Sequence, residues 1–137
     1  MAIKITWATT KDVDKLYDLD KIAHKENKFW NVQTKASFRK IIKKSKFLTI
    51  IAFNNNKPVG YLQSGMKNTK IHLWIENIFV VKKYRKKGIA RLLVKRFTSH
   101  WKSRVENIVL ITSDRNLRIF KRLGFKKEMN YMNYKKK

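Results

Sequence analysis

Apolar residues recur along the chain with two different periods, and these predict a mixed succession of strands and helices. Helical spacing predicts a first helix that begins with Thr10 as its N-cap, and further helices over residues 34–46 and from Ile89 to about Lys102. Alternating or continuous apolar runs predict strands over residues 3–7, 47–53, 58–64 and 71–81. The polar residues 54–57 make the second and third of these strands a hairpin.

The C-terminal quarter repeats the pattern on a smaller scale. Residues 108–112 form an almost uninterrupted apolar run, which predicts a buried strand. Ser113 then caps a short helix that Gly124 ends, and residues 125–134 predict a last strand. We therefore expect one domain over residues 1–137, of the α/β (α+β) class, with about six strands and four helices.

The junction between the fourth strand and the third helix is the stretch with the clearest chemistry. A strand that leads through a basic loop into a helix leaves backbone N–H groups without partners at the helix N-terminus. The helix dipole adds partial positive charge there, so such a junction binds phosphate groups. A basic loop is also a common solvated surface, and context has to decide between the two.

The loop sequence from Arg85 to Ala90, Arg-x-x-Gly-x-Ala, resembles the pyrophosphate-binding motif of the GNAT superfamily of N-acetyltransferases. Residues 113–125, with their aromatic residue followed by Gly124-Phe125, resemble a second signature of that family. The opening strand and helix and the hairpin also match, so the resemblance covers nearly the whole chain. It implies the GNAT fold, with a mixed, mostly antiparallel central sheet splayed between its fourth and fifth strands.

The resemblance implies acetyl-coenzyme A as co-substrate and assigns a binding role to two segments. Its pantetheine arm would pair with the backbone of the fourth strand, at Ile78, Phe79 and Val80, and the Val80 N–H would be the oxyanion donor. The pyrophosphate would bind the loop and first helical turn, with side-chain contacts from its cations, at Arg85, Lys86, Lys87, Gly88, Ile89, Ala90 and Arg91. Ser113 stands where the family often has Asn.

Glu76 is the candidate general base. It lies nine residues before Arg85, the place of the base in many small-amine acetyltransferases of this family. Its apolar neighbours predict partial desolvation, which would raise its pKa toward a useful value. A structural carboxylate neutralised by nearby lysines is the alternative, with the opposite effect on the pKa.

Phe120 departs from the family pattern. It occupies the position of the usual Tyr that protonates the departing thiolate, and it has no hydroxyl group. Tyr131, Tyr134 or solvent would have to replace that acid. A slow enzyme, or a protein that binds the co-substrate without turnover, is therefore one of the open interpretations.

The formal net charge of +25 bears on the partner. Residues 31–70 contain nine Lys or Arg residues and no acid, a field that attracts polyanions and disfavours a polyamine acceptor. Phe29, Trp30 and the basic second helix combine the ingredients of nucleic-acid binding, although aromatic residues beside a helix are more often core and AT-rich coding also enriches Lys.

Three functions remain open. The first is acetylation of a protein amine, a lysine or an N-terminus; the second is acetylation of an RNA-linked amine such as aminoacyl-tRNA. The third is a nucleic-acid-binding protein on the same fold without turnover.

The sequence lacks the residues that thiol catalysis and metal binding would need. The chain has no Cys, and its three histidines show no metal-ligand spacing, so we expect neither thiol catalysis nor a metal. No apolar run approaches the roughly 18 residues of a membrane span, so we expect a cytoplasmic protein, monomeric or homodimeric.

Overall fold

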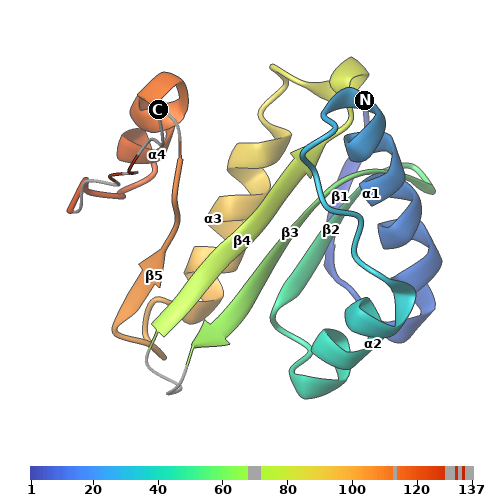
Figure 1. Ribbon diagram of the computed structural model, residues 1–137, viewed down its shortest axis with the longest axis horizontal. Helices are drawn as coiled ribbons and strands as arrows, with labels where there is room; N and C mark the ends of the chain where they lie inside the picture. The colour runs from blue at the N-terminus through green and yellow to red at the C-terminus, as the bar shows by residue number, and fades with distance from the viewer. Residues whose placement is uncertain (68–71, 113, 129–131, 133, 135–137) are drawn as a thin grey trace.

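A computed structural model describes residues 1–67, 72–112, 114–128, 132 and 134 of the chain (Figure 1). The described residues contain five strands, four α-helices and two single-turn 3₁₀ helices. In chain order these are β1 (Ile3–Trp7), η1 (Thr10–Asp12), α1 (Val13–Glu26), α2 (Lys35–Lys44), β2 (Thr49–Asn54), β3 (Lys57–Lys67), β4 (His72–Val80), η2 (Lys82–Tyr84), α3 (Ile89–Trp101), β5 (Asn107–Val109) and α4 (Asp114–Arg122).

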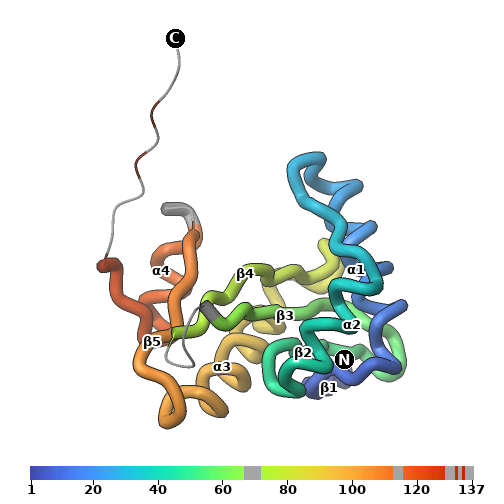
Figure 2. Tube along the Cα trace, turned by 60° about the horizontal axis from the view of Figure 1, so that its bottom comes forward, coloured from blue at the N-terminus to red at the C-terminus, as the bar shows by residue number. Residues whose placement is uncertain are grey.

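The strands form one sheet in the order β1-β2-β3-β4-β5. The first four are antiparallel to their neighbours, and β5 joins β4 in parallel. Helices α1 and α2 cover one face of the sheet, and α3 covers the other (Figures 1 and 2). Each face has its own buried cluster, one under α3 and one under α1 and α2. The mixed, mostly antiparallel sheet agrees with the fold expected from the sequence.

The sheet separates at its last strand pair. Strand β5 pairs only with His72, Leu73 and Trp74, at the start of β4. Strand β4 continues to Val80, whereas the chain after β5 leads away from it toward α4 (Figure 1). This is the expected splay between the fourth and fifth strands, and it leaves one edge of β4 without a partner strand from Ile75 to Val80.

Two element boundaries differ from the sequence-based expectation. Thr10 is not the N-cap of the first helix, because it lies inside η1. Thr9 precedes that turn in extended conformation, and the Asp12 carboxylate accepts a hydrogen bond from the Thr9 N–H at 2.8 Å. The predicted buried strand over residues 108–112 is shorter, and Ile111 is 68% exposed because the chain has already left β4 there.

The predicted last strand over residues 125–134 does not form in its described part. Phe125 instead closes the end of α4, because its N–H donates to the Phe120 carbonyl at 3.0 Å and the two rings meet edge to face. Gly124 adopts a φ of 97°, the left-handed conformation that ends helices, as expected. Residues 129–131 and 133 of the predicted strand lie outside the described residues, as does Ser113. In the described part of the chain, no helix has both the length and the apolar character needed to cross a bilayer.

Candidate active site

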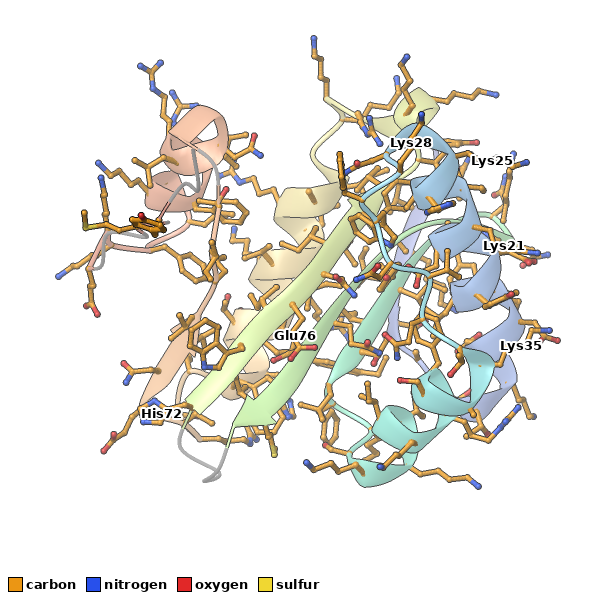
Figure 3. The ribbon with its side chains drawn as sticks, in the orientation of Figure 1. Lys21, Lys25, Lys28, Lys35, His72 and Glu76 are labelled. Atoms are coloured by element: carbon orange, nitrogen blue, oxygen red, sulfur yellow. The ribbon has the colours of Figure 1, made fainter. Side chains whose placement is uncertain are left out.

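A β-bulge in the middle of β4 places Glu76. Gln63 of β3 faces Asn77, whereas the next residue, Ser64, faces Ile75, so Glu76 is one residue more than β3 can match. A bulge of this kind redirects side chains and is frequent beside active sites. It puts Glu76 on the face of the sheet that carries α1 and α2 (Figure 3).

The carboxylate of Glu76 lies directly over Gly65 of β3. A Cβ atom built on Gly65 would come within 2.6 Å of Oε1 of Glu76, so a larger residue at 65 would displace the carboxylate from this position. Glu76 itself is exposed in the protein alone. The partial desolvation expected from its apolar neighbours is therefore not provided by the protein chain.

A cavity of about 230 Å³ opens beside Glu76, between β4 and the chain that follows β5. Its lining comes from three segments: Trp30 from the α1–α2 connection, four residues of β4, and the stretch from β5 into α4. The described lining residues are Trp30, Ile75, Glu76, Asn77, Ile78, Leu110, Ile111, Thr112 and Asn116. Another hollow, at the β2–β3 turn, is lined by Lys4, Thr6, Lys15, Phe53, Asn55 and Asn56 and contains no carboxylate or histidine.

The backbone of β4 points toward this cavity at alternate residues. The Val81 N–H donates to the Val59 carbonyl at 2.9 Å, so these opposed residues form a hydrogen-bonded pair. Opposed residues in an antiparallel pair alternate between bonded and non-bonded, which makes Val80 and Ile78 non-bonded positions. Their N–H and C=O groups are therefore directed away from β3, toward the edge that β5 leaves.

The loop after β4 turns into α3 through two left-handed residues. Lys86 has a φ of 62° and Gly88, the N-cap of α3, a φ of 82°. The N–H groups of Ile89, Ala90 and Arg91 form the first turn and have no intrahelical partner by geometry. The first turn of α3 contains no acidic residue, so no carboxylate of its own competes for this positive end.

Arg85, the first residue of the loop motif, binds elsewhere in the protein. Its Nε donates to the Val80 carbonyl at 2.8 Å, and its guanidinium forms an ion pair with Glu26 at the end of α1. The same guanidinium lies 5.7 Å from the centre of the Phe79 ring. Arg85 thus ties the end of β4 to the end of α1, and a contact with pyrophosphate stays a prediction.

A buried carboxylate fixes the aromatic wall of the cavity. Asp20 of α1 is fully buried, and its oxygens accept hydrogen bonds from Trp30 Nε1 at 3.0 Å, from the Gln33 N–H at 2.8 Å and from the Tyr61 hydroxyl. No described cation pairs with it. Burial, together with the hydrogen bond to Asp20 and its negative charge, raises the pKa of Tyr61 far above its usual range.

The network holds Trp30 from several sides. Besides the bond to Asp20, its ring packs on Phe79 with centroids 5.6 Å apart, and its carbonyl is 2.8 Å from His24 Nδ1. The indole therefore has little freedom to move, and it faces the cavity as a preset wall.

Phe120 packs against the apolar cluster beneath α3 and against Phe125, with ring centroids 5.9 Å apart. Tyr134, one of its possible replacements, is 92% exposed, and Tyr131 lies outside the described residues. In the described chain, the α4 residue that does line the cavity is Asn116, one turn before Phe120.

Sequence reasoning missed several residues of this site. Asn77 lay in no motif, Asn116 lay in the second signature without a role of its own, and Gly65 was seen only as part of a hairpin. A glycine within a strand is a known sign of close backbone approach, and this signal could have identified Gly65 had the predicted strand extended beyond residue 64, as β3 does. The described residues contain no group of three or more His, Asp or Glu side chains arranged to hold a metal ion.

Comparisons with known proteins agree with this geometry. Residues 14–135 match the family model described as acetyltransferase (GNAT) domain. A search of curated proteins returned no match.

Among solved structures, a predicted acetyltransferase with acetyl-CoA from Clostridium acetobutylicum superposes with a TM-score of 0.77 at 17% identity, covering 98% of this chain and 96% of that one. An aminoglycoside acetyltransferase from an uncultured soil sample, in complex with sisomicin, gives 0.73 at 15% identity, covering 98% and 97%. A candidate acetyltransferase from Pyrococcus horikoshii gives 0.75 at 22% identity over 92% of this chain, which spans only 44% of that protein. At these identities the structures show a shared fold.

Proposed function

The chain belongs to the GNAT family of acetyl-CoA-dependent acetyltransferases, and from this premise we propose that it acetylates a primary amine of a protein, a lysine or an N-terminus. The observation that carries the proposal is the position of Glu76. Glu76 lies on the bulge of β4, over Gly65. It also lines a cavity that borders the uncovered edge of β4, along which the acetyl-CoA of this family is expected to bind.

The residues present fit acetyl-CoA. It supplies an acetyl thioester, and the chain offers it a free strand edge and a positive helix end. The outward N–H and C=O groups of Ile78 and the N–H of Val80 suit an extended amide chain lying along β4, while the Val80 carbonyl already accepts a hydrogen bond from Arg85. The first turn of α3, with exposed Lys86 and Lys87 before it, suits the pyrophosphate.

Glu76 is proposed as the general base that takes a proton from the acceptor ammonium, directly or through one water. Its exposure means that the bound substrates, and not the protein, would exclude water from it. The Val80 N–H, directed toward the same edge, is proposed to donate to the carbonyl oxygen as negative charge develops on it.

The cavity supports an acceptor with a single positive charge. Glu76 is the only carboxylate among its described lining residues, and the others are amide, hydroxyl, aromatic or aliphatic. A multiply charged amine would meet one carboxylate inside a protein of net charge +25. A lysine side chain or an N-terminus places one ammonium against Glu76 and Trp30, where the ring face adds attraction for a cation.

Changing Glu76 to Gln tests the base. We expect kcat to fall by roughly two to three orders of magnitude, because the amide cannot accept the proton, while the KM for acetyl-CoA stays within about twofold. The acidic limb of the pH–rate profile should also disappear. The measurement is steady-state kinetics on a lysine peptide between pH 6 and about 9.5, a range that spans the useful pKa of a general base.

Glu106→Gln is the matched control. It removes a carboxylate that is also exposed, just before β5 and outside the cavity lining, so its kinetics should equal those of the wild type. A wild-type rate and pH profile for Glu76→Gln would remove Glu76 from the mechanism.

A weakly active or inactive protein is the second candidate, and Phe120 is the observation that favours it. No hydroxyl of α4 reaches the cavity in the described chain, so protonation of the thiolate would fall to solvent. Phe120→Tyr tests this directly. A clear gain in kcat would show that the missing acid limits turnover. If both the wild type and Phe120→Tyr bound acetyl-CoA but transferred acetyl to no amine, the protein would be a binding protein and not an enzyme.

A further inference from the structure

Two helices, α2 and α4, carry exposed basic faces. Helix α4 lies beside the uncovered part of β4, and α2 lies farther across the same face of the sheet, next to α1 (Figures 1 and 2). The α2 face consists of Arg39, Lys40, Lys43 and Lys44, and the α4 face of Arg118, Lys121 and Arg122, all exposed. Glu76 is the only carboxylate among the described residues that line the cavity.

These charges are not neutralised within the described protein. Each of the four described ion pairs involves α1 or its end, through Asp12, Asp14, Asp18 or Glu26. The chain has no acid between Glu26 and Glu76, and none from residue 115 to 127. The α2 face therefore lacks the acidic neighbours that surround the lysines of α1, although Lys35 at the start of α2 does reach Asp14, at 3.1 Å. The sequence of α4 has one acid, Asp114, at its first residue.

The rim of the cavity also exposes apolar side chains. Ile111, on the cavity wall, is 68% exposed, and the half-buried Ile78 and Leu110 line the same cavity. A branched aliphatic residue has no ring on which a base could stack, whereas it packs well on an apolar peptide side chain. The mixture of cations and an aliphatic contact therefore favours a polypeptide over a nucleic acid.

We infer that the acceptor amine is presented by an acidic stretch of a protein, which the α2 and α4 faces hold while the amine enters the cavity at Glu76. This inference rests on the proposed function and adds the chemistry of the acceptor. Long-range attraction would act mainly on association, because the charges are exposed. The opposite charge of Glu76 would select the one cationic group of an otherwise anionic segment.

Three peptides test the inference. Each has a blocked N-terminus and one central lysine, and its flanks are Asp and Glu, Asn and Gln, or Arg, which adds charge without adding an acceptor amine. We expect kcat/KM to be at least about tenfold higher for the acidic peptide than for the neutral one, and lowest for the Arg peptide. The preference should shrink as salt is raised.

A pair of charge-reversal variants locates the effect. Arg39→Glu with Lys40→Glu changes two adjacent exposed residues of α2, and Lys95→Glu with Arg96→Glu changes two adjacent exposed residues of α3, on the opposite face of the sheet. The net charge changes equally in both. We expect the α2 variant to lose the preference for the acidic peptide and the α3 variant to keep it.

Several outcomes would overturn the inference. Equal kcat/KM values for the three peptides would do so. An equal loss of the preference for the acidic peptide in both variants would also do so, because it would show that the net charge of the whole protein, and not the α2 face, causes the preference. Tighter binding of a single-stranded RNA than of the acidic peptide, lost in the α2 variant, would replace the protein by a nucleic acid. Peptide binding is measured separately by fluorescence anisotropy, so an acidic peptide that binds preferentially but is not acetylated contradicts the proposed function and not the docking surface.

Discussion

The two faces of the sheet differ in the polarity of the residues that they bury. The cluster under α3 is largely apolar, with Leu93, Val94 and Phe97 of the helix packed on Leu62 and Leu73 of the strands. Its polar atoms are few, among them the Trp101 indole N–H, which donates to the Phe47 carbonyl at 2.8 Å. The face under α1 and α2 buries polar groups as well, including Asp20, Thr49 and Gln63. Of these, Gln63 donates to Thr49 at 2.9 Å but leaves its own Oε1 without a described partner.

This difference matches what each face has to position. The α3 face holds a backbone feature, the helix N-terminus, which needs only a rigid support. The α1–α2 face holds the side chain of Trp30 at a set orientation, and a directional hydrogen bond to a buried acceptor does this better than apolar contact. We therefore expect damage to the α3 face to lower stability, and damage to the buried polar groups to alter acceptor binding.

Phe97→Ala should have the largest effect and leave acceptor binding alone. Phe97 is fully buried and its ring lies 6.2 Å from that of Trp7, so its removal should lower the free energy of unfolding by about 3–5 kcal/mol. Urea unfolding measures this, with kinetics on the folded fraction. Leu92→Ala, on the exposed side of the same helix, should change stability by no more than about 0.5 kcal/mol. A raised KM for the acceptor in Phe97→Ala would break the division between the faces.

Asp20→Asn should have a smaller effect on stability and a specific one on the acceptor. Three donors meet the Asp20 carboxylate, and an amide has only one oxygen for them. A donor left facing the amide N–H₂ should lower the free energy of unfolding by about 1–3 kcal/mol. Movement of Trp30 should raise the KM for the acceptor, while the KM for acetyl-CoA stays constant.

Tyr61→Phe is the matched control for this change. It removes one donor to the same carboxylate but leaves the bonds of Trp30 and Gln33 in place. Stability should again fall by about 1.5–3 kcal/mol, because the lost bond is to a charged group, with an unchanged KM for the acceptor. An unchanged acceptor KM in Asp20→Asn would mean that the network serves stability alone, and an equal rise in both variants would mean that the effect does not run through Trp30.

The sequence predicted the scaffold better than the site for a physical reason. Strand β4 and helix α3 have strong local periods, and the loop between them has a spacing that can be read from neighbouring residues. The bond between Asp20 and Tyr61 joins residues 41 positions apart, and the contact of Glu76 with Gly65 depends on how β3 and β4 are aligned. Local patterns do not contain this information.

Most errors in the prediction have the same origin. The bulge at Glu76 shifts the alternation of β4, so that Ile75 and Val80 face the same cluster although they differ in parity. The run of residues 108–112 is as apolar as a buried strand, but the splay exposes Ile111. Thr9 caps η1 because Asp12, which is itself the N-cap of α1, reaches back to the Thr9 N–H. The first two errors come from tertiary contacts, whereas the third comes from a local contact three residues apart that the prediction missed.

The smallest predicted effect is a pH dependence on the apolar side of the sheet. His100 of α3 stacks on Phe47 at 4.1 Å and lies among Trp7 and Trp101. This burial, and then the charge of Arg104, lower the pKa of His100. Below the usual His pKa of about 6.5, the unfolded chain therefore binds a proton that the folded protein does not. Stability should fall as the pH drops through that value toward the lowered pKa.

The comparison of His100→Gln with the wild type isolates this contribution. Urea unfolding at pH 7.5, where His100 is neutral in both the folded and the unfolded state, gives the reference free energy of unfolding of each protein. At about pH 5.5, one unit below the usual His pKa, we expect the free energy of unfolding of the wild type to have fallen more than that of the variant. The variant removes the titrating group but not the fold around it, so its loss over the same range should be smaller. An equal loss in both proteins would place the pH-sensitive group elsewhere. The α3 face would then be, as its composition suggests, an apolar support without a titrating member.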